Sequence, residues 1–348
     1  MKLALTADWH FRGKDLRAAE AQLSALISES KSRGVELVCV AGDIFDSANV
    51  HDGHASVGAI VAAIVSLLAG SGLEWLMIPG NHDFRNTNQV DALAVLEGLH
   101  NVTVVRKHSW HRIHEHRLAV LCIPWDWSGA DAAKTIEALD TETPQGVTRI
   151  LLAHWQIGGM KLNAHRVHEG GGSWCISREF LDSYAAPRFD RIACGDFHIR
   201  QDYYVGALRQ LSFGEEDNPA GFEVFDTETK AVEWVELDAA PRYHNFVSRS
   251  PEDLTTFDWP EGDYAKIRIV GYTPDKVTVA KLQQDGAIVE EIPETIERLA
   301  RAEEIPEGIM DKPVELLRIW ASNQTPPVEN VDELIEVFGA VESPAQAP

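Results

Sequence analysis

Cysteine and positive charge are both scarce in this chain, and each scarcity excludes a class of protein. The four cysteines among 348 residues include no Cys-x-x-Cys pair, so we expect reduced, buried thiols in a cytoplasmic protein rather than a disulfide framework. Lysine and arginine number 31 against 54 aspartates and glutamates, which gives a net charge of −23. Residues 211–348 hold 30 acidic and 11 basic residues, against 24 and 20 in residues 1–210, so the second part should not bind DNA through a broad basic face.

The sequence also lacks a long apolar run and a recognisable leader. Met1-Lys2-Leu3-Ala4 continues directly into a predicted strand, so no signal peptide is expected. The longest apolar stretch, Val57 to Ala69, is shorter than the roughly 20 residues of a membrane-spanning helix, and we interpret it as a buried helix. These features predict no association with a membrane.

Residues that can bind metal ions follow five short apolar runs that are typical of buried strands. In open α/β sheets, ligands bind outside the carboxyl ends of the strands. Singly, each motif is also typical of a turn or of a hydrogen-bonded core residue, but turn chemistry does not explain all five in this order. The motifs are Asp8-Trp9-His10, Gly42-Asp43, Gly80-Asn81-His82-Asp83, His154, and Gly195-Asp196-Phe197-His198.

The spacing and chemistry of these residues predict two metal ions. Side chains alternate across a strand, so Asp8 and His10 should converge on a common point, as should Asp196 and His198. Three carboxylates, one amide and three imidazoles are too many for one ion, but they suit two divalent ions about 3.5–4 Å apart that share a carboxylate. Because no thiolate is among these donors, manganese or iron is favoured over a structural zinc.

Strands and helices alternate through the first part of the chain, which favours sheets flanked by helices. Apolar spacing predicts a helix over Leu16–Ser32, and strands are expected over Trp110–His116 and Tyr203–Phe213, among others. We interpret the histidines around the second of these segments as exposed hairpin residues rather than as a third metal site. They are His108, His111, His114 and His116.

The last third of the chain has a different organisation. We place a boundary at Pro241, after which strands and a helix indicate a small α/β module. Two amphipathic helices are predicted over Pro313–Asn323 and Val331–Phe338. Their apolar faces either pack on their own domain or dock a partner.

Taken together, the five motifs resemble, in order, the ligand motifs of the calcineurin-like metallophosphoesterases. Within that family the chain is similar to the SbcD-type DNA double-strand-break repair nuclease subunit, through Tyr204-x-Gly206, Ser212-Phe213-Gly214-Glu215 and Pro313-Val314-Glu315-Leu316-Leu317. The resemblance implies an α/β fold with a two-sheet αββα sandwich over residues 1–241. A capping domain over 242–304 and a C-terminal helical region over 305–348 would follow it.

The resemblance also implies an activity and partners. It implies a manganese-dependent, two-metal DNA nuclease that acts as a 3′-to-5′ exonuclease on duplex ends and as an endonuclease on single strands. The expected partners are DNA, a second copy of the chain, and a coiled-coil ABC-type ATPase of the SbcC kind docked by the C-terminal helices. Two rivals are a small-molecule phosphodiesterase of the same superfamily and a weakly active subunit that presents DNA to the ATPase.

The family's functional residues transfer to this chain position by position. The first metal would be held by Asp8, His10, Asp43 and His198, and the second by Asp43, Asn81, His154 and Asp196. His82 would be the general acid or the transition-state stabiliser at the leaving oxygen. If DNA is the substrate, the attraction is expected from the metals and from basic residues that follow the ligand stretches, each of which is alternatively a solvated surface charge. These residues are Arg12, Lys14, Arg17, Arg85, Lys161 and Arg166.

One position departs from the family pattern. The family normally has histidine where this chain has Asp196. A carboxylate is a competent manganese ligand, but a third one lowers the net positive charge of the site. This predicts a weaker attraction for phosphate and a more alkaline rate profile. The alternative is that Asp196 only hydrogen-bonds His154 from behind.

Overall fold

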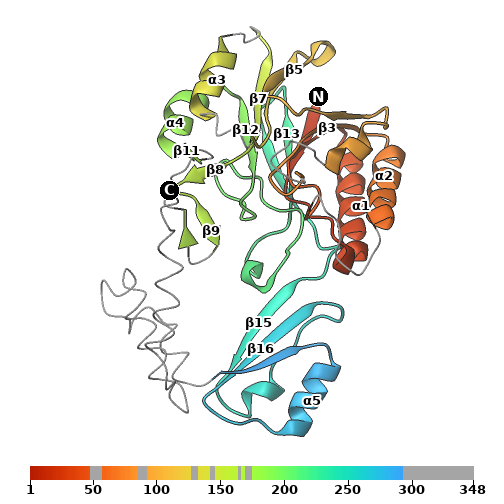
Figure 1. The fold of residues 1–348 in the computed structure, drawn as a ribbon, viewed down its shortest axis with the longest axis vertical. Helices are drawn as coiled ribbons and strands as arrows, with labels where there is room; N and C mark the ends of the chain where they lie inside the picture. Colours follow the sequence, from red (N-terminus) through yellow and green to blue (C-terminus); the bar gives the residue numbers. More distant parts are fainter. Residues whose placement is uncertain are drawn as a thin grey trace, which may run out of the picture. The chain divides into compact units, whose positions relative to one another are not determined.

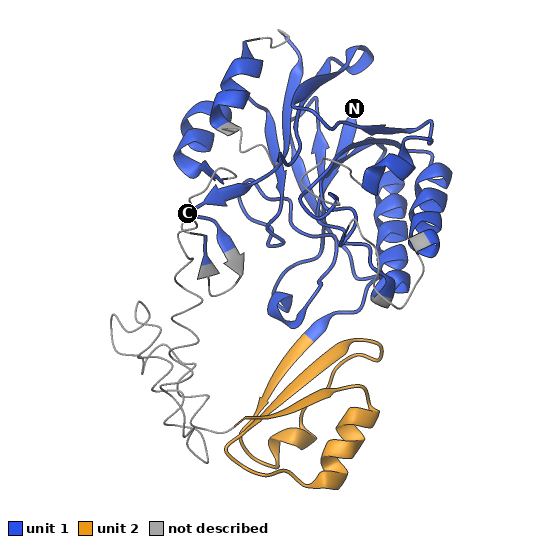
Figure 2. Cartoon of the chain, viewed as in Figure 1, with its two compact units in different colours: residues 1–243 blue, residues 244–348 orange. Residues whose placement is uncertain are grey.

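The chain divides into two compact units, residues 1–243 and 244–348 (Figure 2). The computed structural model describes residues 1–47, 57–84, 92–126, 132–141, 146–163, 166–168 and 175–292. The expected helices over Pro313–Asn323 and Val331–Phe338 lie outside these residues. No helix in the described ranges combines the length and the apolar character needed to cross a membrane.

The first unit contains a six-stranded sheet in the order β14-β13-β1-β2-β3-β4. Strands β1 to β4 run parallel, whereas β13 and β14 are antiparallel additions at one edge. Strands β1, β2 and β3 are buried along nearly their whole length, as expected for strands covered on both faces. Their bounds are β1 Lys2–Thr6, β2 Val35–Ala41, β3 Glu74–Ile78, β4 Val102–Val104, β13 Gly221–Asp226 and β14 Val232–Glu236.

A second sheet of four strands has the order β12-β7-β6-β5. Strands β12, β7 and β6 are parallel, and β5 pairs antiparallel with β6. The bounds are β5 Ser109–Ile113, β6 Leu118–Ile123, β7 Thr148–His154 and β12 Arg191–Gly195. Smaller pairs join β8 Gln156–Gly158 to β11 Cys175–Ser177 and β9 Lys161–Asn163 to β10 Arg166–Val167.

The two sheets pack against each other through a mainly apolar layer. Leu5, Cys39 and Leu76 from the first sheet belong to the same buried cluster as Val120 and Leu152 from the second. Alternate residues of the same strands face outward, where helices cover them. Figure 1 shows α1 Leu16–Ser32 and α2 Val57–Gly70 on one outer side, and α3 Ala132–Asp140 and α4 Arg178–Phe180 on the other. The expected αββα sandwich is therefore confirmed.

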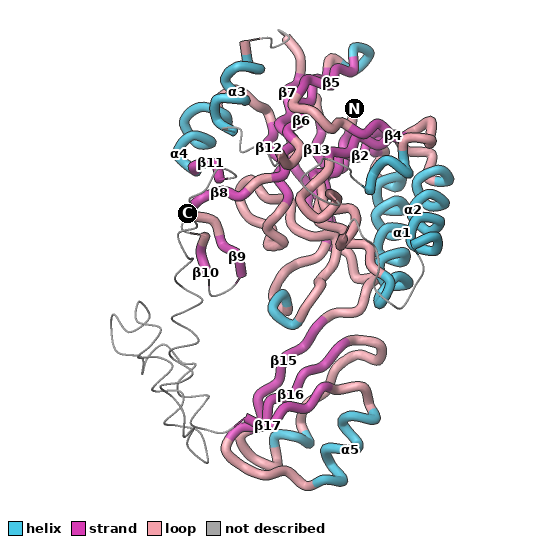
Figure 3. Tube along the Cα trace, viewed as in Figure 1, coloured by secondary structure: helices cyan, strands magenta, loops and turns pink. Residues whose placement is uncertain are grey.

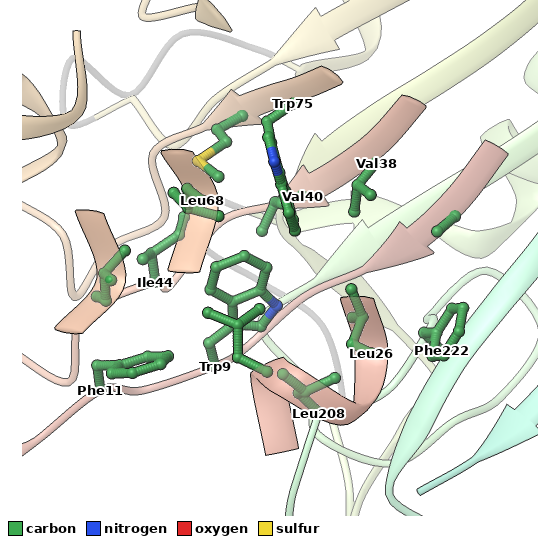
Figure 4. Close-up of a cluster of buried hydrophobic side chains, with 14 of the residues drawn as sticks. Trp9, Phe11, Leu26, Val38, Val40, Ile44, Leu68, Trp75, Leu208 and Phe222 are labelled. Carbon is green, nitrogen blue, oxygen red and sulfur yellow. The ribbon is translucent and has the colours of Figure 1, made fainter. Parts of the chain in front are cut away.

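A second core fills the space between the first sheet and α1 and α2 (Figure 4). Trp9 and Trp75 meet edge to face in it, with ring centroids 5.8 Å apart. Helix α1 begins and ends at the predicted residues. Helix α2 buries only the stripe Ile60, Ile64 and Leu68, so the expectation of a buried helix is wrong. Its apolar run includes small residues, and alanines and a serine tolerate exposure on the outer face.

The strand expected over Tyr203–Phe213 is also wrong. This segment makes only isolated bridges, because side chains from other elements take its backbone groups. Gln22 donates to the carbonyl of Leu208, and Arg12 donates to the carbonyl of Leu211. Figure 3 shows the resulting loops, in pink, beyond the magenta strands. Likewise, His114–His116 forms a 3-10 turn rather than the end of a strand.

The described part of the second unit is a three-stranded sheet with one helix. Strand β16 Tyr264–Val270 lies between β15 Tyr243–Ser248 and β17 Ile288–Ile292. Helix α5 Lys276–Gln284 begins at Asp275, whose carboxylate accepts a hydrogen bond from the backbone N–H of Thr278. This agrees with the predicted α/β module. The division at residue 304 falls outside the described residues and stays a prediction.

Replacing Leu26 of α1 with alanine should destabilise the first unit. Leu26 is fully buried between the helix and the sheet, so Leu26→Ala should lower the free energy of unfolding by about 2–5 kcal/mol. The matched control is Ser28→Ala, an exposed position on the same helix. Denaturant titration followed by tryptophan fluorescence measures both variants. Equal losses for the two would contradict the packing described here.

Candidate metal centre

Five strand ends bring the predicted ligands together at one edge of the sandwich. Strands β1, β2 and β3 are neighbours in the first sheet, and β7 and β12 are neighbours in the second. Parallel neighbours end at the same edge, so the residues that follow them meet. The structure brings together all seven predicted ligands there, and two subsets of them offer donor atoms within 4.8 Å of one another. The seven are Asp8, His10, Asp43, Asn81, His154, Asp196 and His198.

The first subset consists of Asp8, His10 and His198. The rings of His10 and His198 lie 4.9 Å apart, and Asp8 and His10 are buried. The Nδ1 atom of His198 donates to Glu215 Oε1 at 2.9 Å. This hydrogen bond fixes the ring so that Nε2 is the nitrogen left to bind a cation.

The second subset consists of Asp8, Asp43 and His154. The Nδ1 atom of His154 donates to the carbonyl of Ala41 at 2.7 Å, which leaves Nε2 directed to the site. Three oxygen atoms face this Nε2: Asn81 Oδ1 at 2.9 Å, Asp43 Oδ2 at 3.5 Å and Asp196 Oδ1 at 3.8 Å. Because Ala41 occupies Nδ1, Asp196 does not hydrogen-bond His154 from behind.

Asp43 joins the two subsets. Its Oδ2 atom lies 3.6 Å from His10 Nε2 and 3.5 Å from His154 Nε2, so one oxygen faces the donors of both groups. Its other oxygen accepts a hydrogen bond from the backbone N–H of His82 at 2.9 Å. Although burial alone would raise it, the pKa of Asp43 is held well below its usual value, chiefly by His154. The carboxylate is therefore charged.

The donor set fits divalent cations. Asp8 Oδ2 and His10 Nε2 are buried side-chain atoms that have no hydrogen-bond partner among the described residues. Buried polar atoms are normally paired, so their lack of protein partners suits a bound cation. Burial raises the pKa of Asp8 to about 6. A carboxylate whose charged form is disfavoured by burial is strongly stabilised by a positive charge beside it.

The imidazoles attract protons as well as cations. Burial would lower the pKa of His154, but the nearby Asp43 carboxylate outweighs it and raises the pKa to about 10. Burial would likewise lower the pKa of His198, but the nearby carboxylates of Glu215 and Asp8 raise it to about 9. Metal ligands must be deprotonated, so a cation competes with protons for both rings.

The backbone at the ligands corrects the argument from strand alternation. Regular strand geometry ends at Thr6 and Gly195, before the ligands begin. Four ligands have left-handed φ angles, an unusual state for residues other than glycine. The angles are 54° at Asp8, 45° at His10, 54° at Asp43 and 101° at Asp196.

The two Asp-x-His motifs therefore behave differently. Asp8 and His10 still reach one point, through local backbone turns rather than through alternation. Asp196 and His198 do not share a point, because Asp196 faces His154 whereas His198 lies with Asp8 and His10. The expectation that this second motif converges on a common point is wrong.

Two glycines allow the strand ends to approach closely. A Cβ atom at Gly42 would lie 2.3 Å from His154 Nδ1, and one at Gly80 would lie 2.2 Å from Asp43 Oδ1. Gly42 also has a φ of 88°. The Gly-Asp and Gly-Asn pairs in the sequence thus mark backbone contact between strand ends, in addition to turn formation.

Sequence reasoning missed three acidic residues that support the ligands. Asp83 is fully buried and accepts hydrogen bonds from the backbone N–H groups of Ile44, Phe45 and Gly80. Glu215 orients His198, and Asp46 Oδ1 lies 3.2 Å from His10 Nδ1. The Gly-Asn-His-Asp motif contained Asp83, but nothing local indicated that its partners come from the preceding loop.

His82 occupies an exposed position beside the donors. Its ring lies 4.8 Å from that of His10, and its Nδ1 atom donates to the carbonyl of Asp46 at 2.7 Å. The same ring contributes to a group with His10 and Asp46 whose donor atoms lie within 4.8 Å of one another. With Nδ1 occupied, Nε2 is the nitrogen available to an incoming molecule.

The basic residues have different environments. Arg12 is buried, pairs with Asp15 at 2.7 Å and donates to the Leu211 carbonyl, so the expectation that it attracts DNA is wrong. Arg17 lies on the exposed side of α1, and Lys161 is exposed on β9. Lys14 belongs to a 3-10 helix and Arg166 to β10, but their side chains are not described. Arg85 lies outside the described residues.

Comparison with known proteins agrees with this geometry. Residues 1–200 match the calcineurin-like phosphoesterase family, and the chain belongs to it. Members of this family are hydrolases that use divalent metals. The chain is also 26% identical over 247 residues to exonuclease subunit 1 of Enterobacteria phage T4, a match that covers 68% of this chain and 67% of that protein.

Two solved structures are more distant. GAP50, the anchor in the inner membrane complex of Plasmodium, is 12% identical with a TM-score of 0.37, covering 85% of this chain and 98% of that one. A glutamine-dependent NAD(+) synthetase from Cytophaga hutchinsonii is 9% identical with a TM-score of 0.31, covering 97% and 72%. Both scores are low, so neither likeness contributes to the assignment.

Removing the Asp83 carboxylate should damage both stability and metal binding. Asp83→Ala leaves three buried N–H groups without their acceptor, which should cost about 3 kcal/mol or more of unfolding free energy. Manganese affinity should fall as well, because these groups position the loops of Asp43 and Asn81. Denaturant titration and calorimetric titration with Mn²⁺ measure the two effects.

The matched control for this variant is Asp253→Ala. Asp253 accepts hydrogen bonds from the backbone N–H groups of Arg249 and Ser250 in the second unit, in an accessible position. Its loss should cost much less stability and leave Mn²⁺ binding unchanged. Wild-type Mn²⁺ affinity in Asp83→Ala would show that Asp83 does not hold the ligand loops.

Proposed function

We propose that this chain is a manganese-dependent DNA nuclease, a 3′-to-5′ exonuclease on duplex ends and an endonuclease on single strands. The observation that carries the proposal is the position of Asp43, whose Oδ2 atom faces His10 and His154 at 3.6 and 3.5 Å. A carboxylate shared between two donor groups is the arrangement that a two-metal phosphoesterase needs.

The proposed ligand roles come from the family resemblance, and the two donor groups support them. Asp8, His10, Asp43 and His198 would hold the first cation, and Asp43, Asn81, His154 and Asp196 the second. Cations bound there would polarise the phosphoryl group and activate water for in-line attack on phosphorus. The protein contributes a fixed arrangement, because Ala41 and Glu215 orient His154 and His198 before any substrate binds.

His82 is the residue of this chain that we place on the leaving group. Its exposure and the hydrogen bond from Nδ1 to Asp46 leave Nε2 facing outward, and in the protonated ring Nε2 would donate a proton or a hydrogen bond to the departing sugar oxygen. Its backbone N–H binds Asp43, so the ring is anchored to the carboxylate shared by both groups.

The choice of DNA as substrate is supported by the phage relative. That protein is named an exonuclease subunit, which also supports a multi-subunit complex. We propose that this complex acts in DNA repair or recombination. We propose a cytoplasmic location, a homodimer, and a coiled-coil ABC-type ATPase of the SbcC kind as partner. Residues 242–304 would form a capping domain, and 305–348 would dock the ATPase. Lys14, Arg17, Arg85, Lys161 and Arg166 remain proposed DNA contacts.

The substrate is tested with a 3′-labelled DNA duplex and Mn²⁺, with and without the ATPase. We expect stepwise removal of 3′ nucleotides that a chelator abolishes and fresh Mn²⁺ restores. Hydrolysis of bis-p-nitrophenyl phosphate without any DNA cutting would instead identify a small-molecule phosphodiesterase. Failure to cut either substrate, with DNA still bound, would identify a DNA-presenting subunit.

Replacing His82 should separate chemistry from metal binding. We expect His82→Ala to lower the nuclease rate by about 100-fold or more, the usual contribution of a positioned acid, and to keep wild-type Mn²⁺ stoichiometry. The control is His114→Ala, an exposed histidine in the turn after β5 that should retain the full rate. A wild-type rate in His82→Ala would contradict the role given to this residue.

Docking of the ATPase is tested in the predicted helix over Pro313–Asn323. Leu317→Asp places a charge on the face that Val314, Leu317 and Trp320 share, so the full-length variant should fail to co-purify with the ATPase. Its Mn²⁺-dependent activity without the ATPase should be unchanged. Glu315→Ala, off that face, is the control and should still bind. Normal binding of Leu317→Asp would place the interface elsewhere.

A further inference from the structure

The two donor groups differ in chemistry. Two imidazole nitrogens, from His10 and His198, face Asp8 and Asp43 in the first group. In the second group a single imidazole nitrogen, His154 Nε2, is surrounded by oxygen atoms of three residues at 2.9, 3.5 and 3.8 Å. Those oxygens belong to Asn81, Asp43 and Asp196. The two groups therefore present unequal sites to a cation.

We propose that the second group is an oxygen-rich site whose preference for zinc over manganese is weaker than that of the first group, and that Asp196 is the residue that determines this difference. The inference rests on the nuclease proposed above, whose metal requirement it would explain. Neither the family assignment nor the phage relative determines which of the two sites in this chain prefers Mn²⁺ or Zn²⁺.

The position of Asp196 supports a ligand role rather than a surface role. Its side chain is only 9% exposed, and its carboxylate accepts no hydrogen bond from the described residues. Its backbone N–H donates to Asp8 Oδ1 at 3.0 Å, and Asp8 offers a donor atom within 4.8 Å of those of Asp43 and His154. A buried carboxylate without hydrogen-bond donors is costly unless a cation compensates its charge.

The backbone also directs Asp196 to the site. Its φ of 101° is a conformation that residues with a side chain rarely adopt. The preceding residue, Gly195, closes β12 and pairs with His154 at the end of β7, so Asp196 begins beside its metal-binding neighbour. Such local strain persists where the surrounding structure imposes it, and it is concentrated at functional sites.

Ligand chemistry gives the direction of the selectivity. Carboxylate and amide oxygens suit manganese and magnesium, whereas imidazole nitrogen suits zinc. Zinc binds most nitrogen-containing sites more tightly than manganese does, and a site with three oxygen ligands to one nitrogen narrows that advantage. The first group has two nitrogen donors, so its preference for zinc over manganese is not reduced in this way. The two sites should consequently differ in their preference between Mn²⁺ and Zn²⁺.

The experiment replaces the oxygen donor with a nitrogen donor. Purified full-length protein and its Asp196→His variant are titrated with Mn²⁺, followed by the paramagnetic resonance of free Mn²⁺, and then challenged with Zn²⁺. Metal content after desalting gives the composition of each site. We expect wild type to bind two Mn²⁺ per chain, and Asp196→His to raise the Zn²⁺ preference of one site by about tenfold or more.

Two further variants make the result interpretable. Asp196→Asn keeps the size and one oxygen but loses the charge, so it should weaken one Mn²⁺ site without a comparable gain for Zn²⁺. Asp202→Asn changes an exposed aspartate that pairs with Arg178, and it should leave both sites unchanged. Thermal unfolding of each metal-free variant shows that the proteins compared are folded.

The outcomes separate this inference from the proposed function. If wild type binds two Mn²⁺ and cuts DNA but Asp196→His keeps the wild-type metal preference, the selectivity role of Asp196 is wrong and the nuclease assignment stands. If wild type binds fewer than two cations or needs none for cutting, the two-metal nuclease itself is wrong. A selective rise in Zn²⁺ binding in Asp196→His alone supports the inference.

Discussion

The arrangement of this site depends on a buried negative charge at Asp43. Burying a carboxylate is unfavourable unless donors or cations surround it, and here the backbone of His82 and the rings of His10 and His154 do so. Those residues follow or end strands of two different sheets. Stabilising this charge therefore requires strands of both sheets to end beside Asp43. The apolar layer between the sheets holds the strands in that position.

Much of this could be predicted because strand ends are a local signal. A short apolar run followed by glycine and a polar residue identifies the end of a buried strand, and parallel strands end at one edge. These two rules predict that Asp8, Asp43, Asn81 and His154 lie together, and the structure places them at one edge of the sandwich. Prediction fails where regular geometry stops, since the left-handed backbone at Asp8 and Asp196 determines where each side chain points, and alternation along a strand does not.

The missed features share a physical cause, which is that their partners lie far away in the chain. Asp83 accepts from the backbone of a loop 38 residues earlier, and Arg12 donates to a carbonyl 199 residues later. No periodicity reports such contacts, because they form only when the tertiary structure brings loops together. The same cause explains why the strand predicted over Tyr203–Phe213 does not form, because side chains of distant residues donate hydrogen bonds to its carbonyl groups.

The left-handed backbone at four ligands has a consequence for how the site loses and rebinds cations. These conformations are held by packing of the strand ends and by hydrogen bonds between protein groups, so their stabilising contacts do not include a cation. We therefore expect the ligand arrangement to be retained when the ion is removed, unlike that of zinc modules that unfold without their ion. Cations should therefore dissociate from the site and bind to it again without refolding of the chain.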